Sequence, residues 1–520
     1  MGLTSGGTLL TAEEYHESLR AYQPKVFIDG DRVESVADDP RLAPGIRAVG
    51  VTYDFAQRVE FGGLMLAEQQ TSGKQVNRML HINRHTEDLL SKLEAVRLLC
   101  RESGCAQRYL THDALNAIFQ STHRLDENQG SGEYLERFLA YLHGVQDKDL
   151  TLGVAMTDAK GERSLRPHSQ SNPDTYVHIV ERRSDGIVIS GTKAIVTGAP
   201  YMHELLVMPC RTMIEADADF AVCCAVPLDV AGLTIISRVA GRPGEADAKF
   251  SAKYGQSTAV CQFDKVFVPW DRVFMAGEWE HTEHLVTSYA NHHRHSCIGA
   301  RAGFGDLLIG AGSLMTEANG LDIETVPHLR DSMVELIKIV EGFFACGVAS
   351  SVYGVQDPCG SFMPEPVFSN VGKLLLATQI YDMHRIAHEV SGGLIVALPG
   401  PDEDHNPHTA GDLAAVLGAR PDVPYAQRAE VSRLLGDLTA SSTGGWYSVI
   451  SLHGGGSPQA MKREIFRRYP IEERRALVER LLDRGVADTG ESGAPPRARQ
   501  PGQCCTTGCV PPALPQDAPD

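Results

Sequence analysis

The stretch STAVCQFDKVFVPWDRVF, residues 257–274, decides the fold class. It is a short run of alternating apolar residues that ends in turn-forming residues, which is typical of a β-strand. Similar runs fill residues from about 151 to 280, among them YVHIVERRSDGIVISGTKAIVTG at 176–198. They predict a central β domain, built as a barrel or a sandwich.

Helical patterns lie on both sides of this β domain. Apolar residues recur at three and four spacing in HTEDLLSKLEAVRLLCRES at 85–103 and in VPHLRDSMVELIKIVEGFFACGVASSVYG at 326–354. We therefore expect an α+β protein with four parts: an N-terminal helical domain at 1–150, a β domain at 151–280, a C-terminal helical bundle at 281–486 and a disordered tail at 487–520. The tail carries Cys504, Cys505 and Cys509 and is rich in Pro and Gly.

Composition narrows the class of function. The chain has 520 residues, with 48 basic and 66 acidic side chains and a net charge of −18. This balance argues against nucleic acid or anionic lipid as a partner and favours small molecules. No window approaches the length of a membrane span, and the first residues lack the order of a signal peptide, so we expect a cytoplasmic protein. The twelve cysteines are scattered, as expected of buried thiols in a reducing compartment.

The order of helices, β domain and helices is that of flavoproteins with the acyl-CoA dehydrogenase-like fold. Five stretches resemble the 4-hydroxyphenylacetate 3-hydroxylase family, and within it the 4-hydroxybutyryl-CoA dehydratase branch. They are NRMLHINRHTEDLL (77–90), AMTDAKGERSLRP (155–167), VTGAPYMHELLVMP (196–209), SGGLIVALP (391–399) and LHGGGSPQAMKR (452–463). The resemblance implies FAD held without a covalent bond, and a homotetramer whose subunits complete one another's flavin sites.

The chemistry of these stretches suits a flavin. Hydroxyl groups that can bond to the ring edge and cations that can meet a pyrophosphate open the β domain, and glycines let the backbone approach phosphates. The candidate FAD-binding residues are Thr157, Lys160, Arg163, Ser164, Thr197, Gly392, Gly393, Gly454 and Gly455.

The dehydratase branch holds a four-iron, four-sulfur cluster with three cysteines and one histidine. Its pattern has two cysteines four residues apart, then a histidine and a third cysteine seven residues later. Cys105 and His293 match the first cysteine and the histidine, but the other two positions are Tyr109 and Ala300. The branch's acidic residue before the His-Gly-x-Gly turn is replaced by Ile450. We therefore expect no metal cluster.

A rewired cluster is the alternative, because Cys100, Cys105, His293 and Cys297 restore three cysteines and one histidine. His293 and Cys297 lie about 40° apart around a helix and face the same way, whereas Cys100 and Cys105 lie about 140° apart. The neighbouring His292 and His295 point elsewhere, and we expect them to meet solvent or another subunit.

The hydroxylase branch holds a phenol with an arginine, a tyrosine four residues later and a histidine at the start of the β domain. Arg108 matches the arginine, but the other two positions are His112 and Asp158. His112 still offers a donor to a substrate oxygen. Alternatively, Arg108 and His112 form an ordinary surface pair one helical turn apart, near Asp113.

These observations predict a flavin-dependent oxidoreductase, with His293 as the acid/base group and Arg108, His112 and Tyr109 as further catalytic candidates. The leading hypothesis is a monooxygenase that uses O2 and reduced FAD from a separate reductase on a small organic substrate. The absence of G-x-G-x-x-G after a strand favours a separate electron donor. A CoA-thioester dehydratase or isomerase and a non-catalytic flavoprotein scaffold remain as alternatives.

Overall fold

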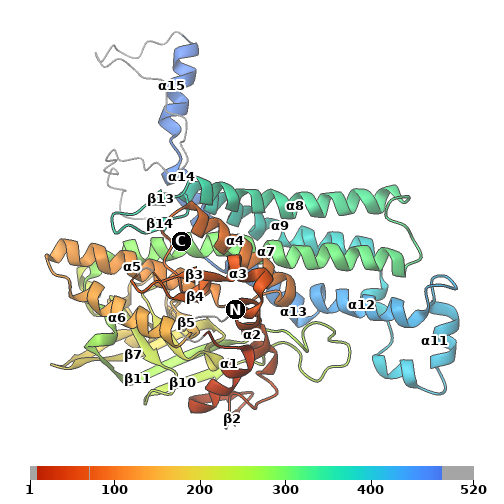
Figure 1. Ribbon diagram of the computed structural model, residues 1–520, viewed down its shortest axis with the longest axis horizontal. Coiled ribbons are helices and arrows are strands. Elements are labelled where there is room, and N and C mark those ends of the chain that lie inside the picture. The colour runs from red at the N-terminus through yellow and green to blue at the C-terminus, as the bar shows by residue number, and fades with distance from the viewer. Residues whose placement is uncertain (1–8, 70, 483–520) are drawn as a thin grey trace.

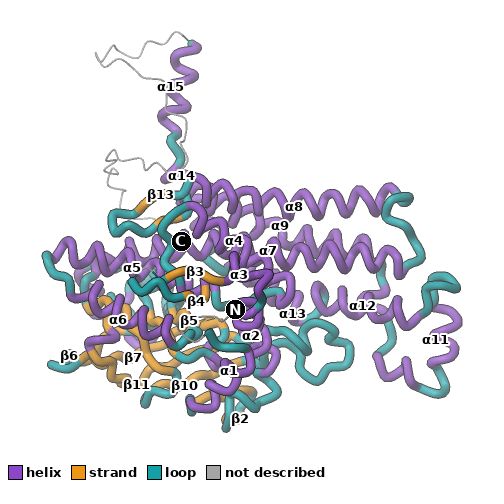
Figure 2. The backbone as a smooth tube through the Cα atoms, in the orientation of Figure 1, coloured by secondary structure: helices purple, strands orange, loops and turns teal. Residues whose placement is uncertain are grey.

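A computed structural model describes residues 9–69 and 71–482 of the chain (Figure 1). The expected order of helices, β-sheets and helices is confirmed, with the sheets packed at one end of a layer of long helices (Figure 2). The predicted tail at 487–520 lies outside the described residues. None of the helices that the structure describes is long and apolar enough to cross a membrane.

The first 150 residues are mainly helical. The helices are α1 (Ala12–Ser18), α2 (Ala43–Gln57), α3 (Gly62–Met65), α4 (Thr86–Ser103), α5 (Tyr109–Gln129) and α6 (Glu133–Asp147). The same part also contains two strands, β1 (Lys25–Ile28) and β2 (Asp31–Val33), which the helical pattern did not predict, and a hairpin of β3 (Leu66–Glu68) and β4 (Gln75–Asn77). β1 buries Val26 and Ile28 by pairing in parallel with a strand of the central sheet, so the chain crosses between the two parts.

The central part forms two open sheets from the described strands rather than a closed barrel. The larger sheet has the order β2-β1-β10-β11-β7-β6 and the smaller has β12-β9-β8-β5. The additional strands are β5 (Leu152–Ala155), β6 (His178–Arg182), β7 (Gly186–Thr197), β8 (Glu204–Val207), β9 (Val222–Pro227), β10 (Leu233–Ser237), β11 (Thr258–Pro269) and β12 (Val273–Ala276). β11 comes from the stretch quoted first and pairs with both β10 and β7, which places it inside the larger sheet.

The C-terminal part consists mainly of helices, the three longest of which form the long layer of Figure 1. The helices are α7 (Thr282–Ala318), α8 (Pro327–Val352), α9 (Pro366–Ser391), α10 (Leu394–Ala397), α11 (Ala410–Leu417), α12 (Tyr425–Thr439), α13 (Ser442–His453), α14 (Pro458–Arg468) and α15 (Ile471–Leu481); a two-stranded ribbon of β13 (Val355–Gln356) and β14 (Phe362–Met363) joins α8 to α9. α7 has 37 residues and is about 55 Å long. It packs against α4, α5, α8 and α9, so its middle is enclosed on all sides.

Glycines let α4 and α7 approach closely. A Cβ added at Gly303 of α7 would lie 2.4 Å from the Arg97 carbonyl oxygen of α4, and one added at Gly299 would lie 2.7 Å from the Leu93 carbonyl oxygen. Atoms of a neighbouring backbone cannot move aside as a flexible side chain can. The separation of the two helices is therefore set by these glycines.

We expect Gly303→Ala to lower the free energy of unfolding by about 1–3 kcal/mol, because the new methyl group must push α4 away. Gly310→Ala on the same helix is the control. Nothing lies within 4 Å of a Cβ at Gly310, so this variant should be neutral or stabilising by up to about 1 kcal/mol. Urea unfolding of both variants measures the difference. Equal free energies of unfolding for the two variants would show that α4 and α7 can move apart at this contact without cost.

Candidate functional site

The segment His292–Cys297 lies in the enclosed middle of α7, and all six of its side chains are buried. The expectation that His292 and His295 meet solvent or another subunit is wrong, because α8 and α9 cover the faces of α7 that α4 and α5 leave free. His295 Nε2 lies 2.8 Å from the Ser351 hydroxyl of α8. Burial lowers the pKa of His292 to about 3, so this side chain is neutral near pH 7.

His293 lies between a carboxylate and a thiol. Its Nδ1 is 3.1 Å from Asp113 Oδ2 on α5, and its Nε2 is 3.6 Å from the Cys297 sulfur one turn along α7. The rings of Tyr289 and Tyr109 lie nearly parallel to its ring, with centroids 5.3 and 6.1 Å away. The three polar groups form a line along which a proton can move, Asp113–His293–Cys297, which we call the proton relay.

Charge interactions set the protonation of the relay. Burial alone would lower the pKa of His293, but the neighbouring Cys297 sulfur and Asp113 carboxylate raise it to about 9. Burial alone would raise the pKa of Cys297, but His293, Lys373 and Arg301 lower it to about 7. The stabilisation that the His293 imidazolium contributes to the folded protein is lost as the pH rises through about 9 and the ring loses its proton. The stabilisation that the Cys297 thiolate contributes is lost as the pH falls through about 7 and the sulfur gains a proton. An imidazolium–thiolate pair is therefore expected between these two pH values.

Asp113 is held by more than His293. The Ser296 hydroxyl donates to its Oδ1 at 2.6 Å, and Lys92 Nζ of α4 lies 3.7 Å from the same oxygen. Burial opposes ionisation of this carboxylate, but the Lys92 charge and hydrogen bonds from His112 and His293 keep the pKa of Asp113 well below its usual range. The carboxylate is therefore ionised at neutral pH and orients the His293 ring.

The sequence prediction did not assign a site role to Lys92 or Asp113. A signal was present for Lys92, which lies on the apolar face of α4, three residues after Leu89 and four before Val96. A charged side chain in the middle of a buried face needs a partner, and here the partner is Asp113.

Arg108 and His112 bond to different partners, and His112 Nδ1 also lies 3.6 Å from the Asp113 carboxylate that contacts His293. Arg108 has no exposed surface and pairs with Asp149, while its NH2 also donates to the Asp149 carbonyl oxygen at 2.9 Å. His112 Nε2 lies 3.1 Å from the Asn83 amide oxygen, and burial lowers the pKa of His112 to about 4. They are therefore not a surface pair. Asp158, at the histidine position of the hydroxylase pattern, forms a buried ion pair with Lys193 at 2.6 Å.

Buried polar atoms that lack a partner among the described residues gather where the first helical part meets the β-sheets. Those at this junction include both amide atoms of Gln107, the amide oxygen of Gln256 and the hydroxyl of Ser257, and others lie elsewhere in the fold. Gln107 lies against Gly198, where a Cβ would come within 2.5 Å of its amide oxygen, and the Gly198 N–H donates to the Ser257 carbonyl oxygen. These free donors and acceptors match the polar edge of a flavin ring. The residues next to Thr197 therefore fit the expected cofactor.

The other candidate FAD-binding residues lie in three separate places. Thr157 and the loop with Lys160, Arg163 and Ser164 are at the surface or half-buried on the β part, Gly454 and Gly455 follow α13, and Gly392 and Gly393 are exposed after the C-terminal end of α9. Gly455 lies next to Lys373 near the start of α9, so Gly392 is about 28 Å away along that helix. Within one chain, the two glycine pairs cannot hold the same part of a cofactor.

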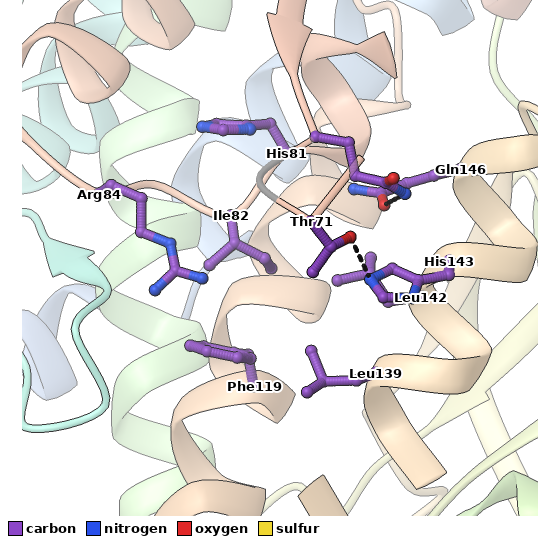
Figure 3. A pocket seen from close by; sticks show the side chains of 10 residues that line it. Thr71, His81, Ile82, Arg84, Phe119, Leu139, Leu142, His143 and Gln146 are labelled. Carbon is purple, nitrogen blue, oxygen red and sulfur yellow. Dashed lines mark hydrogen bonds between the residues drawn. The ribbon is translucent and has the colours of Figure 1, made fainter. Parts of the chain in front are cut away.

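A small cavity lies between the β3–β4 hairpin, α5 and α6 (Figure 3). Its volume is about 50 Å³, and it is lined by Gln69, Thr71, His81, Ile82, Arg84, Phe119, Leu139, Leu142, His143 and Gln146. Arg84 reaches toward the apolar wall, with its guanidinium 5.0 Å from the Phe119 ring centroid, and Thr71 bonds to His143 across the opening. This volume holds water rather than an organic substrate. A second cavity, of about 300 Å³, is lined by Ala67, Glu68, Arg78, His81, Arg84, His85 and Asp88. Neither of these two cavities is lined by a residue of the proton relay.

Comparison with known proteins identifies the family. Residues 11–275 match the N-terminal part and residues 282–483 the C-terminal part of 4-hydroxyphenylacetate 3-hydroxylase. The chain belongs to the 4-hydroxyphenylacetate 3-hydroxylase family. Both matches together cover nearly all of the described residues.

Two branches of the 4-hydroxyphenylacetate 3-hydroxylase family are among the relatives. The 4-hydroxybutyryl-CoA dehydratase/vinylacetyl-CoA-Delta-isomerase of Clostridium aminobutyricum is 34% identical over 91% of this chain and 99% of its own length. The solved oxygen-tolerant archaeal 4-hydroxybutyryl-CoA dehydratase from N. maritimus is also 34% identical, covers 94% of this chain and 97% of its own, and superposes with a TM-score of 0.88. The 4-hydroxyphenylacetate 3-monooxygenase oxygenase component of Thermus thermophilus is 24% identical over 91% of this chain and 98% of its own.

The residues present do not fit the iron–sulfur cluster that the dehydratase pattern implies. Cys105 lies 3.4 Å from the Tyr109 hydroxyl, which occupies a position where that pattern has a thiolate. Cys100, Cys105, His293 and Cys297 are all described, yet no group of three or more His, Cys, Asp or Glu in the described part of the chain is arranged to hold a metal ion. Cys100, Cys105 and Cys297 nevertheless lie close enough together that, besides burial, Cys105 and Cys297 raise the pKa of Cys100, and His293 contacts Cys297. The rewired set therefore stays an alternative that iron analysis must test.

We expect alkylation of Cys297 by iodoacetamide to show a midpoint near pH 7, because His293 stabilises the thiolate. His293→Gln should move this midpoint up toward 9, the ordinary value for a thiol. Peptide-resolved mass spectrometry across a pH series measures both. Cys346 is the internal control, since burial raises the pKa of its thiol. Equal midpoints for Cys297 and Cys346 would mean that no imidazolium–thiolate pair forms.

Proposed function

We propose that this chain is a monooxygenase that uses O2 and reduced FAD, supplied by a separate flavin reductase, on a small organic substrate. The observation that carries the proposal is the buried proton relay, which stands beside Tyr109 and Ala300 where the dehydratase pattern needs two thiolates. Residues that fit a flavin are present, and those that would hold a cluster are incomplete, so the flavin is the proposed redox group. The relay would supply protons beside it.

FAD supplies the redox chemistry toward O2 when it is bound, and this chain's residues bind and orient it. Gln107, Gln256 and Ser257 would bond to the ring edge beside Thr197. The pyrophosphate would meet Lys160 and Arg163, with Thr157 and Ser164 as hydroxyl donors. Because Gly392 and Gly393 lie about 28 Å from Gly455, we propose that a neighbouring subunit of a homotetramer brings one glycine pair to the flavin. A cytoplasmic location fits the cysteine usage.

His293 is the proposed acid/base group, since it is the only imidazole of the segment that bonds to a carboxylate and a thiol together. Tyr109 stacks on it and narrows the space beside it. Arg108 retains two guanidinium nitrogens, Nε and NH1, without a hydrogen-bond partner among the described residues, and His112 lies one turn away. We therefore keep Arg108 and His112 as candidate substrate-orienting residues, with the buried Asp149 fixing the arginine.

Dehydration or isomerisation of a CoA thioester is the second candidate. It is supported by the 34% identity to the Clostridium enzyme over almost the full length. A proton relay without a cluster would also serve an isomerisation, which moves a proton and needs no external electron acceptor. A scaffold that binds flavin without turnover is the third candidate.

We expect protein purified without oxygen to contain FAD but no iron or acid-labile sulfide, and to oxidise reduced FAD in air. With a substrate found among phenols such as 4-hydroxyphenylacetate, His293→Ala should lower turnover by about 10²–10⁴-fold, because it removes the proton-transfer group. Cys105→Ser should have a mild effect. Product analysis with the wild-type and variant proteins measures this, and about four irons per subunit would contradict the proposal.

A restored ligand set is the control for the iron measurement. Tyr109→Cys combined with Ala300→Cys gives back the three cysteines and one histidine of the dehydratase pattern. After anaerobic reconstitution with iron and sulfide, this double variant should gain a cluster that the wild-type protein does not gain. If the wild-type protein and the double variant take up iron equally, the absence of thiolates at positions 109 and 300 does not prevent cluster binding.

We expect Arg163→Ala to weaken FAD binding about 10- to 100-fold, because a charge-assisted hydrogen bond to a phosphate contributes about 1.5–3 kcal/mol. Arg183→Ala is the matched control, since this exposed arginine of the same β part pairs with Glu181. Equilibrium dialysis of apoprotein with FAD gives both dissociation constants. An unchanged constant for Arg163→Ala would place the pyrophosphate elsewhere.

A further inference from the structure

Three buried cations meet at the C-terminal end of α13. Arg301 of α7 donates from Nε to the Ser451 hydroxyl at 2.5 Å, and Lys373 of α9 donates to the Ser451 carbonyl oxygen at 2.6 Å. Arg294 of α7 donates to the Gly455 carbonyl oxygen at 2.9 Å. We call Arg294, Arg301 and Lys373 the cation cluster.

The cation cluster has no carboxylate partner. Among residues 9–69 and 71–482, no Asp or Glu oxygen lies within 4 Å of a nitrogen of these three side chains; Glu464 acts on Arg294 only from farther away. All three are buried, and Arg301 NH1 has no hydrogen-bond partner in the described part of the chain. Buried cations are normally paired, because removal from water costs free energy that only an anion offsets.

Two nearby features neutralise only part of this charge. The C-terminal carbonyl groups of α13 provide about half a negative charge. The Cys297 thiolate acts on Lys373 and Arg301, but it is shared with His293. Asp113 is already occupied by Lys92 and His293. Burial lowers the pKa of Lys373 to about 8, so at neutral pH most of the positive charge of the cluster remains without a compensating carboxylate among the described residues.

The cluster lies beside the proton relay. A Cβ at Gly455 would lie 3.4 Å from the His293 ring, 3.4 Å from the Arg294 side chain and 3.7 Å from Lys373. Cys297 and His293 keep 9% and 8% of their surface although Asp113 is fully buried, so water-sized molecules reach these two side chains of the relay. An anion held by Arg301 and Lys373 would thus lie next to the group that moves protons.

We propose that the cation cluster binds the carboxylate group of the substrate, so that the enzyme acts on small organic acids in their anionic form. The proposal rests on the proposed function, because it takes the relay to be the place of reaction. The FAD pyrophosphate is the other oxyanion available. We assign it to the exposed cations of the β part, whereas the cation cluster is buried beside His293 and Cys297.

The experiment uses FAD-loaded protein and two pairs of probes, acetate with acetamide and benzoate with benzamide. Each pair has nearly the same shape but differs in charge. At constant ionic strength, the carboxylates should raise the midpoint of thermal unfolding and change the visible flavin spectrum, and the amides should do neither. Arg301→Gln and Lys373→Gln should each weaken carboxylate binding at least 10-fold, while Arg301→Lys keeps part of it. Arg101→Gln is the matched control, because Arg101 pairs with Asp306.

The rise in unfolding temperature is compared within each variant, so a less stable variant still gives a result. The proposal is overturned if acetate and benzoate have no effect on the wild-type protein, or if Arg301→Gln and Lys373→Gln respond as the wild-type protein does. It is also overturned if Arg301→Gln weakens binding of FAD but not of riboflavin, because the cluster then holds the pyrophosphate. Failure of the proposed function is distinguishable: it appears as bound iron or loss of reduced-flavin oxidation, which do not depend on acetate binding.

Discussion

The contact between Asp113 and His293 is the interaction on which the site depends. The two residues are 180 positions apart in the chain and lie on α5 and α7, and their 3.1 Å contact joins the first helical part to the C-terminal bundle. Because Lys92 of α4 and Ser296 of α7 bond to the same carboxylate, one buried anion ties three helices together. Loss of that carboxylate would leave two buried cationic groups without their partner, which is more costly than the loss of any one hydrogen bond.

Close packing makes this electrostatic arrangement rigid. Gly299 and Gly303 bring α7 onto the backbone of α4, and α8 and α9 cover the remaining faces. Water is thereby kept from Asp113, so solvent screens the attraction between its carboxylate and His293 only weakly. The same burial keeps His292 and His295 neutral, which leaves His293 as the titrating histidine of the segment near pH 7 to 9. Packing therefore selects one of three neighbouring imidazoles for acid/base work.

The interior and the surface of this protein differ in charge. The chain as a whole carries −18, yet the region around His293 holds Lys92, Arg294, Arg301 and Lys373 against one carboxylate. The interior around His293 is therefore positively charged although the chain as a whole is acidic.

Much of the fold followed from the sequence alone. Apolar spacing predicted α4 and α8, and alternation predicted β11, because each of these patterns reflects burial of one face of a local element. α15 and β7 were also predicted, but α15 buries no side chain among the described residues and β7 is buried on both faces over its first half. The family stretches predicted the order of the parts and the FAD cofactor of the family. β1 and β2 were missed because β1 is stabilised by pairing with β10, more than 200 residues later, and β2 by pairing with β1, and not by a local pattern.

The site itself was decided by the tertiary structure. The sequence singled out His293 and Cys297, which are one turn apart and so face the same way whatever surrounds them. It did not indicate Asp113, Lys92, Arg301 or Lys373 as their partners, since periodicity shows which face of a helix is buried but not which buried faces meet. Nor did it show that His292 and His295 are buried, because their exposure depends on α8 and α9 covering α7. Local spacing determined the candidates, and the packing of distant helices determined their charges, because electrostatic energy depends on distances in space and on exclusion of water.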